Sequence, residues 1–130
     1  MERTISQYAP YLYAALRIVA GLLFAMHGSQ KLFGIPGSGD PVPLFSLMGF
    51  AGVVELGGGL LIALGLFTRV AAFLSSGQMA VAYFMAHLPQ GHVPLLNKGE
   101  LSLIYCFLFL YIAAQGAGIW SLDTGFRKRT

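Results

Sequence analysis

Four long apolar segments constrain this chain more than any other feature of its sequence. Each could cross the hydrocarbon core of a bilayer, which takes about 20 mostly apolar residues. Lipid offers no water to satisfy backbone polar groups, and four strands are too few to close a barrel, so helices are predicted. We therefore predict an all-α fold, an integral membrane four-helix bundle with antiparallel, up-down transmembrane helices. The predicted helices cover about 10–33, 44–66, 69–88 and 101–121.

The composition supports the same class of protein. Charged residues make up 10% of the 130 residues and hydrophobic residues 56%, whereas a soluble domain carries about 25% charged residues to cover its surface. A soluble globular enzyme is therefore excluded. The basic residues form no stripe, so no nucleic acid is expected as a partner. A single cysteine excludes an internal disulfide and a cysteine cluster for a metal. The chain is predicted to be one domain, 1–130.

The charges of the connections predict how the chain is oriented in the membrane. One side would carry Arg3, Arg69 and the basic cluster at 127–129, whereas the other would carry only Lys31 and Lys98. By the positive-inside rule, both termini should be cytoplasmic, in a bacterial inner (plasma) membrane. The loops rich in proline and glycine, 34–43 and 88–99, should then face the external side.

Two charged residues lie deep inside the predicted spans, where such groups are costly and often functional. Arg17 lies about seven residues into the first span, and Glu55 lies at the centre of the second. With the two spans antiparallel and their ends level, the depths differ by about four residues, or ~6 Å. We therefore predict an Arg17–Glu55 ion pair. This pair either contributes to function or only holds two helices together. Glycines share its helix faces and favour close packing: Gly21, Gly28, Gly52 and Gly59.

Further polar residues gather at the predicted external level of the membrane. His27 and Lys31 are four residues apart near the end of the first helix, and His87 ends the third. Lys31 could instead extend to the interface, and Glu100 could merely cap the fourth helix. Taken together, these residues predict a polar pocket open to the external side. The predicted ligand-binding residues are Arg17, Glu55, His27, Lys31, His87, Asn97 and Glu100.

Several sequence motifs, in order, resemble those of the DoxX family. The matching segments are 17–34, 54–69, 97–100 and 116–123, so the resemblance spans about 11–124. It implies a small four-helix inner-membrane protein with a link to redox chemistry, because members are associated with thiosulfate:quinone oxidoreduction and with oxidative-stress complexes. Most members have no established activity. The family positions found here are Arg17, His27, Gly28, Lys31, Glu55, Gly58, Glu100 and Asp123.

The favoured function is a quinone- or redox-linked membrane subunit. His27 and Lys31 could donate hydrogen bonds to quinone oxygens, and Glu55 or Glu100 could relay protons. The candidate catalytic residues are thus Glu55, His27 and Lys31. The chain has no flavin motif and no cysteines for an iron–sulfur cluster. Its electrons would therefore come from a soluble redox partner protein or directly from a reducing substrate.

Two other functions remain open at this stage. The chain could be a non-enzymatic membrane anchor or scaffold, or a protein that binds or transports a small molecule, and its glycine-rich faces could form a homo-oligomer. A haem or a metal ion at His27 and His87 is the least favoured alternative. An error of one residue in helix phase turns a side chain by about 100°, so the spacing does not show that the two imidazoles face each other.

Overall fold

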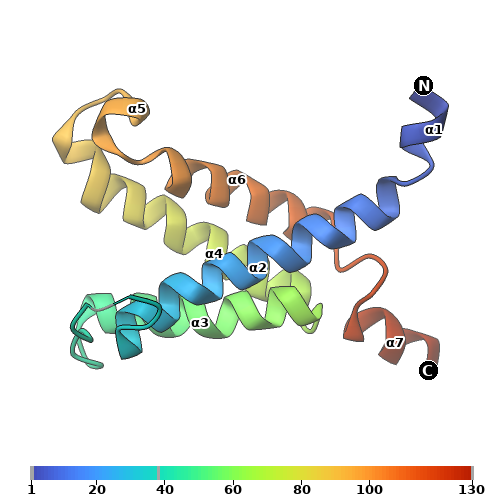
Figure 1. The fold of residues 1–130 in the computed structure, drawn as a ribbon, viewed down its shortest axis with the longest axis horizontal. Coiled ribbons are helices and arrows are strands. Elements are labelled where there is room, and N and C mark those ends of the chain that lie inside the picture. The colour runs from blue at the N-terminus through green and yellow to red at the C-terminus, as the bar shows by residue number, and fades with distance from the viewer. Residues whose placement is uncertain (1, 38, 130) are drawn as a thin grey trace.

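The computed structural model describes residues 2–37 and 39–129, and within them every regular element is helical. Two short helices lie near the chain ends, and four longer ones form the body (Figure 1). The elements are α1 (Glu2–Ser6), α2 (Ala9–Phe33), α3 (Leu47–Leu64), α4 (Thr68–Ala82), the π-helical turn η1 (Tyr83–His87), the 3₁₀ turn η2 (Leu88–Gln90), α5 (Pro94–Asn97), α6 (Glu100–Gln115) and α7 (Leu122–Arg129).

Local sequence explains where the first two long helices begin and end. Pro10 occupies the first turn of α2, where its missing N–H leaves no helical hydrogen bond broken. Gly34 and Gly65 end α2 and α3 in the left-handed conformation, with φ of 75° and 70°, which glycine adopts without steric cost. Ser46 caps α3 by accepting a hydrogen bond from the backbone N–H of Gly49.

The third and fourth helices depart from the predicted windows at their C-terminal ends. The window 69–88 begins as α4, but its last residues form the π turn η1. The window 101–121 is occupied by α6 only to Gln115, because Gly116 and Gly118 take positive φ values and direct the chain away from the helix.

The four long helices form two antiparallel pairs (Figure 1). Helix α2 packs on α3, and α4 packs on α6, while the tight turn after α3 joins the two pairs. Near the turn the pairs lie close together, whereas at the opposite end they diverge, and that end carries the loop after α2 and the segment from η1 to α5 (Figure 1). Both ends of the chain lie on the side of the turn.

Glycines bring the backbones of α2 and α3 into direct contact. A methyl group added at Gly21 would lie 2.6 Å from both the carbonyl oxygen of Gly59 and the backbone nitrogen of Ala63. Gly28 lies in the same way against Gly52 and Leu56. This packing of small residues, which the sequence predicts, fixes the register of the two helices.

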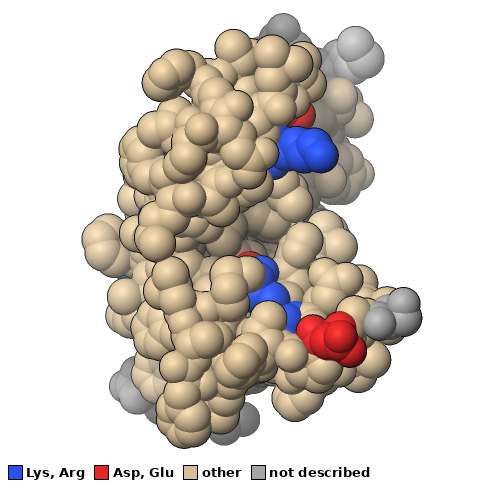
Figure 2. All heavy atoms as spheres, turned by 90° about the vertical axis from the view of Figure 1, so that its left-hand side faces the viewer, with Lys and Arg blue, Asp and Glu red and all other residues tan. Residues whose placement is uncertain are grey.

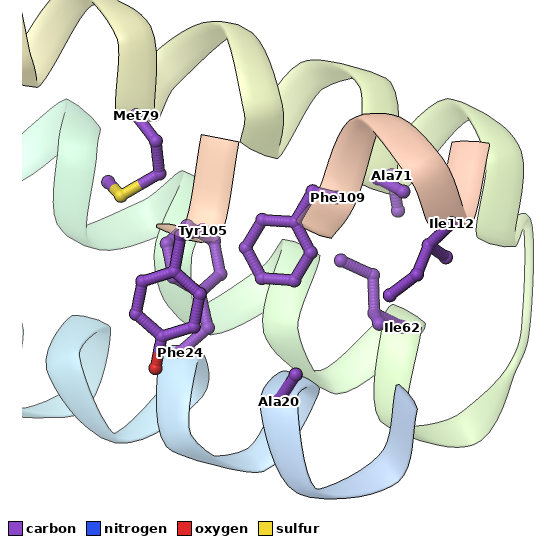
Figure 3. Packing of buried hydrophobic residues seen from close by; sticks show 9 residues of the cluster. Ala20, Phe24, Ile62, Ala71, Met79, Tyr105, Phe109 and Ile112 are labelled. Atoms are coloured by element: carbon purple, nitrogen blue, oxygen red, sulfur yellow. The ribbon is translucent and has the colours of Figure 1, made fainter. Parts of the chain in front are cut away.

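The core lies between the two pairs (Figure 3). Phe24 of α2 meets Phe109 of α6 with ring centroids 4.8 Å apart, and Tyr105 stacks on Phe109 at 5.2 Å. Ile62 of α3 and Ile112 of α6 extend this core toward the turn after α3. The edge-to-face contact of Phe24 with Phe109 and the close packing around it thus hold α6 against the α2–α3 pair.

The outward faces of the helices are strongly apolar. By length and composition, α2 and α3 are both able to cross a membrane, with mean hydropathies of 1.6 and 1.9; α6 is apolar but shorter. Large apolar side chains that a water-soluble protein would bury are exposed along α2. They include Leu12, Leu16, Val19, Leu22, Leu23 and Met26.

Candidate functional site

A cavity of about 590 Å³ opens where the two helix pairs diverge. Figure 2 looks onto this end of the molecule and shows a hollow between two lobes, with basic and acidic side chains near it. The walls come from α2, α3, α4, η1 and α6, and they are mostly apolar. The polar or ionisable lining residues are His27, Lys31, Glu55, Gln78, His87, Lys98, Ser102 and Tyr105.

An ion pair between Lys31 and Glu55 lies on the wall of this cavity. Lys31 Nζ donates a hydrogen bond of 2.9 Å to Glu55 Oε1 and lies 2.8 Å from Oε2. The Glu55 side chain is almost fully buried, at 4% exposed, whereas that of Lys31 is 24% exposed. The cation therefore lies nearer to the opening and the carboxylate deeper, which places a polar centre in an apolar chamber.

The predicted Arg17–Glu55 pair is wrong, because the ends of the two helices are not level. The glycine contacts place Gly65, not a residue near Glu55, at the depth of Arg17. Arg17 and Glu55 are thus separated by roughly ten residues along the helix axis, or ~15 Å, which is beyond the reach of arginine. The first turns of α2 extend past the end of α3 (Figure 1). In this register Glu55 lies within reach of Lys31.

Arg17 instead binds backbone carbonyl groups at the opposite end of the bundle. Its Nη1 donates to Ile62 and Ala63 at 2.8 and 2.9 Å, and its Nη2 donates to Ile119 and Trp120 at 3.2 and 2.7 Å. The side chain is fully buried. It satisfies the carbonyls at the C-terminal end of α3, where the helix dipole favours a cation, and ties that end to the segment after α6.

Both predicted histidines border the cavity. The ring of His27 packs edge-to-face on Tyr105, with centroids 6.2 Å apart. His87 lies in η1, and its Nδ1 is 3.1 Å from the backbone carbonyl oxygen of Asn97. Because a carbonyl oxygen can only accept a hydrogen bond, Nδ1 carries the proton, and in a neutral ring Nε2 is the acceptor.

Asn97 and Glu100 are not among the described residues that line the cavity. Asn97 is fully buried and organises the loop before α6: its Nδ2 donates to Tyr83 Oη and to the Gly91 carbonyl, and its Oδ1 accepts from the Gly99 N–H. Glu100 is exposed at the first residue of α6. At that position it complements the positive end of the helix dipole.

Sequence reasoning missed four polar residues of the lining, namely Gln78, Lys98, Ser102 and Tyr105. The last two are three residues apart and therefore share one face of α6. Phe109 continues that face into the core. The spacing of these residues in the sequence could therefore have indicated that Ser102 and Tyr105 face the interior. Gln78 resembles an ordinary interhelical hydrogen-bonding residue in the sequence, and only the structure places it on the cavity.

The size and lining of the cavity are typical of sites for small molecules. No three His, Cys, Asp or Glu side chains in the described parts of the chain gather closely enough to hold a metal. The cavity volume falls within the range of about 300–1,000 Å³ usual for small-molecule sites. Apolar walls with a few polar groups are typical of pockets for such ligands.

A comparison with known proteins places the chain in a family. The DoxX family profile matches residues 12–88. An uncharacterized protein of Haemophilus influenzae is 43% identical, over 96% of this chain and 98% of its own length. The “Putative oxidoreductase CatD” of Bacillus subtilis is 27% identical, over 83% of this chain and 81% of its own. Inner membrane protein YqjF of Escherichia coli is 29% identical, over 87% and 90%.

No solved structure matches the chain. The family match covers more than half of the sequence, and the Haemophilus relative aligns along almost its whole length. The chain belongs to the DoxX family of membrane proteins.

Proposed function

We propose that this protein is a four-helix, multi-pass inner-membrane protein whose cavity binds a lipid-soluble quinone as part of a redox system. The observation that carries the proposal is the Lys31–Glu55 pair on the wall of an apolar cavity of about 590 Å³. A paired charge at such a site is costly to bury, and it provides the polar contacts and the proton acceptor that quinone chemistry needs.

The packing supports four membrane-crossing helices. α4 continues through η1 without a break, so Thr68–Ala82 and Tyr83–His87 together form a helical rod, antiparallel to α3. α6 runs antiparallel to α4 and is apolar. Both chain ends lie at the same end of the bundle (Figure 1), which suits termini on one side of the membrane. We propose that this is the cytoplasmic side, because it also carries Arg69.

The lining provides the groups that a quinone would need. Phe24, Phe50 and Tyr105 offer ring surfaces for a planar head group, while the apolar walls suit its hydrocarbon tail. Near the opening, His27 and Lys31 are possible hydrogen-bond donors. Glu55 is the candidate proton acceptor. A bound quinone would supply the redox chemistry, whereas these side chains orient it and hold protons.

We place the source of electrons outside this chain. A relative named as an oxidoreductase supports a redox role. A soluble partner protein or a reducing substrate would deliver electrons, and the divergent end of the bundle, where the cavity opens, is the accessible side.

Mass spectrometry of organic extracts from the purified protein tests the proposal. We expect a near-stoichiometric quinone in the native protein, and its loss from Ala82→Phe, which adds a bulky ring to the cavity wall. Asp40→Asn, in an exposed loop outside the lining, should retain the quinone. Thermal unfolding in detergent verifies that each variant is folded.

Bulk lipid alone in every extract, together with no binding of added quinone, would overturn the proposal. The membrane anchor or scaffold function would then be favoured, and crosslinking in cells would identify what the protein holds. Retention of quinone by a folded Ala82→Phe variant would also contradict the assignment, since the ligand would then lie elsewhere.

A further inference from the structure

The cavity separates α3 from α4 along part of their length. Close to the turn, these two helices touch, since a methyl group added at Gly58 would lie 2.6 Å from Ser75 Oγ. Counting equal numbers of residues away from this contact, Ala51 of α3 falls opposite Ala82 of α4. Both of these residues line the cavity. Side chains that would touch in a closely packed helical hairpin therefore border the cavity instead, and the gap between α3 and α4 is part of it.

The edges of this gap belong both to the cavity wall and to the outer surface of the molecule. Large apolar side chains of α3, α4 and η1 line the cavity and are also more than half exposed. They are Leu47, Met48 and Phe50 on α3, and Leu74, Val81 and Met85 on α4 and η1. A wall residue that is also exposed marks the place where a cavity reaches the surface. The cavity thus opens sideways between α3 and α4, and we call this place, with these residues as its rim, the lateral opening.

The polar groups of the cavity lie away from the rim of the lateral opening. α2 contributes His27 and Lys31 to the lining, and α6 contributes Ser102. Glu55 and Gln78 come from α3 and α4, but Glu55 Oε2 and Gln78 Oε1 are buried inside the molecule. In Figure 2, charged side chains gather on one side of the hollow. The cavity therefore offers a polar interior on the side of α2 and an apolar exit between α3 and α4.

We infer that the ligand enters the cavity from the bilayer through the lateral opening, and that its hydrocarbon tail remains in this opening while its polar head lies against Lys31 and Glu55. This inference rests on the proposed function and specifies the ligand class, a polar head on a long apolar tail, and its orientation. A tail in the lateral opening loses no apolar surroundings, because lipid chains are as apolar as the side chains of the rim. In the reverse orientation the tail would desolvate the charges of the ion pair.

A photoreactive probe locates the tail directly. The probe is a decyl quinone with a diazirine at the end of its tail, irradiated with the protein in lipid nanodiscs, with and without an excess of plain decyl quinone. Labelling that the excess removes is specific, and mass spectrometry of peptides assigns it. We expect specific labelling on α3 and α4, at the rim of the lateral opening. Specific labelling on α2 and α6, or none at all from a probe that binds, would overturn the inference and leave the proposed function intact. A probe that does not bind would overturn both.

Substitutions at the lateral opening test the same inference by affinity. Val54→Trp adds a bulky ring to the cavity wall on α3, whereas Val53→Trp adds the same ring to an exposed position outside the lining. By titration calorimetry, Val54→Trp should weaken binding of decyl quinone by about tenfold, because the ring obstructs the path of the tail. Binding of a quinone with a methyl group in place of the tail should change little, and Val53→Trp should affect neither probe.

A second pair of variants keeps the test valid if Val54→Trp fails to fold. Val81→Trp obstructs the lateral opening from α4, and Val70→Trp, exposed on the same helix outside the lining, is its control. Equal weakening of both probes by the folded cavity variants, or no weakening of either, would contradict the inference, since the tail would then lie elsewhere.

Discussion

Lys31 Nζ of α2 lies 2.8 Å from Glu55 Oε2 of α3, so the two charges on the cavity wall neutralise each other. The residues belong to antiparallel helices whose backbones touch at Gly28 and Gly52, which limits how far either side chain can move. The pair is held by the helix register and not by flexible loops. Its geometry therefore depends on the packing of the two helices.

Removing one member of this pair should destabilise the protein more than removing both members. Lys31→Met leaves the Glu55 carboxylate buried without its cation, and we expect a loss of roughly 3 kcal/mol, the lower end for a buried pair because Lys31 is partly exposed. The double variant Lys31→Met/Glu55→Gln carries no buried charge and should recover most of that loss. Thermal unfolding of the single and double variants in detergent measures the coupling. A double variant as unstable as Lys31→Met would contradict the prediction.

Arg17 should be required for the structure of the opposite end. Arg17→Met leaves carbonyl groups of α3 and of the segment after α6 without donors, and we expect a loss of about 3 kcal/mol or more. Arg17→Lys should recover only part of it, since an ammonium cannot serve the carbonyls of both segments as a planar guanidinium does. Limited proteolysis should then cut between residues 116 and 129 faster than in the native protein. An unchanged cleavage rate in Arg17→Met would refute this role.

The sequence predicts the helices better than their pairing. Hydropathy placed α2 at 10–33, within one residue of its observed start, because lipid solvation acts on each segment separately. The partner of Glu55 depends instead on the register between helices. The assumption of level spans failed because α2 is longer than α3 and extends past it. The glycine contacts of the structure, Gly28 against Gly52 and Leu56, set the register that brings Lys31 to Glu55.

The sequence predicted at which end of the helices the candidate site lies, but not which side chains line it. His27, Lys31 and His87 lie at the predicted end and border the cavity. Asn97 does not border the cavity, because its side-chain amide is hydrogen-bonded to the backbone of its own loop. Such local hydrogen bonds depend on the conformation of the 88–99 loop. Hydropathy and helical spacing carry no information about them.

The glycines at which the backbones of α2 and α3 touch should not tolerate even an added methyl group. The Cβ of Gly59→Ala would lie 2.5 Å from both Ala25 N and Gly21 O, which are backbone atoms that cannot rotate away. We expect the helices to separate at a cost of about 2 kcal/mol. Gly57→Ala lies in the same helix with no atom within 4 Å of its new Cβ, and should stabilise the protein by up to about 1 kcal/mol. Unfolding temperatures that shift in the same direction for both variants would contradict this packing.

Asp123 should stabilise the turn between the two helix pairs through its carboxylate. Oδ1 accepts from the Phe67 N–H, and Oδ2 accepts from both the N–H and the hydroxyl of Thr68, at 2.7–2.9 Å. Asp123 thus caps α4 from the start of α7, a contact between segments more than 50 residues apart. Loss of such a cap costs about 1–2 kcal/mol, so Asp123→Ala should lower the unfolding temperature. Asp123→Asn keeps one acceptor oxygen and should fall between Asp123→Ala and the native protein. Equal stability of Asp123→Ala and the native protein would show that the α4 cap contributes nothing to the stability of the protein.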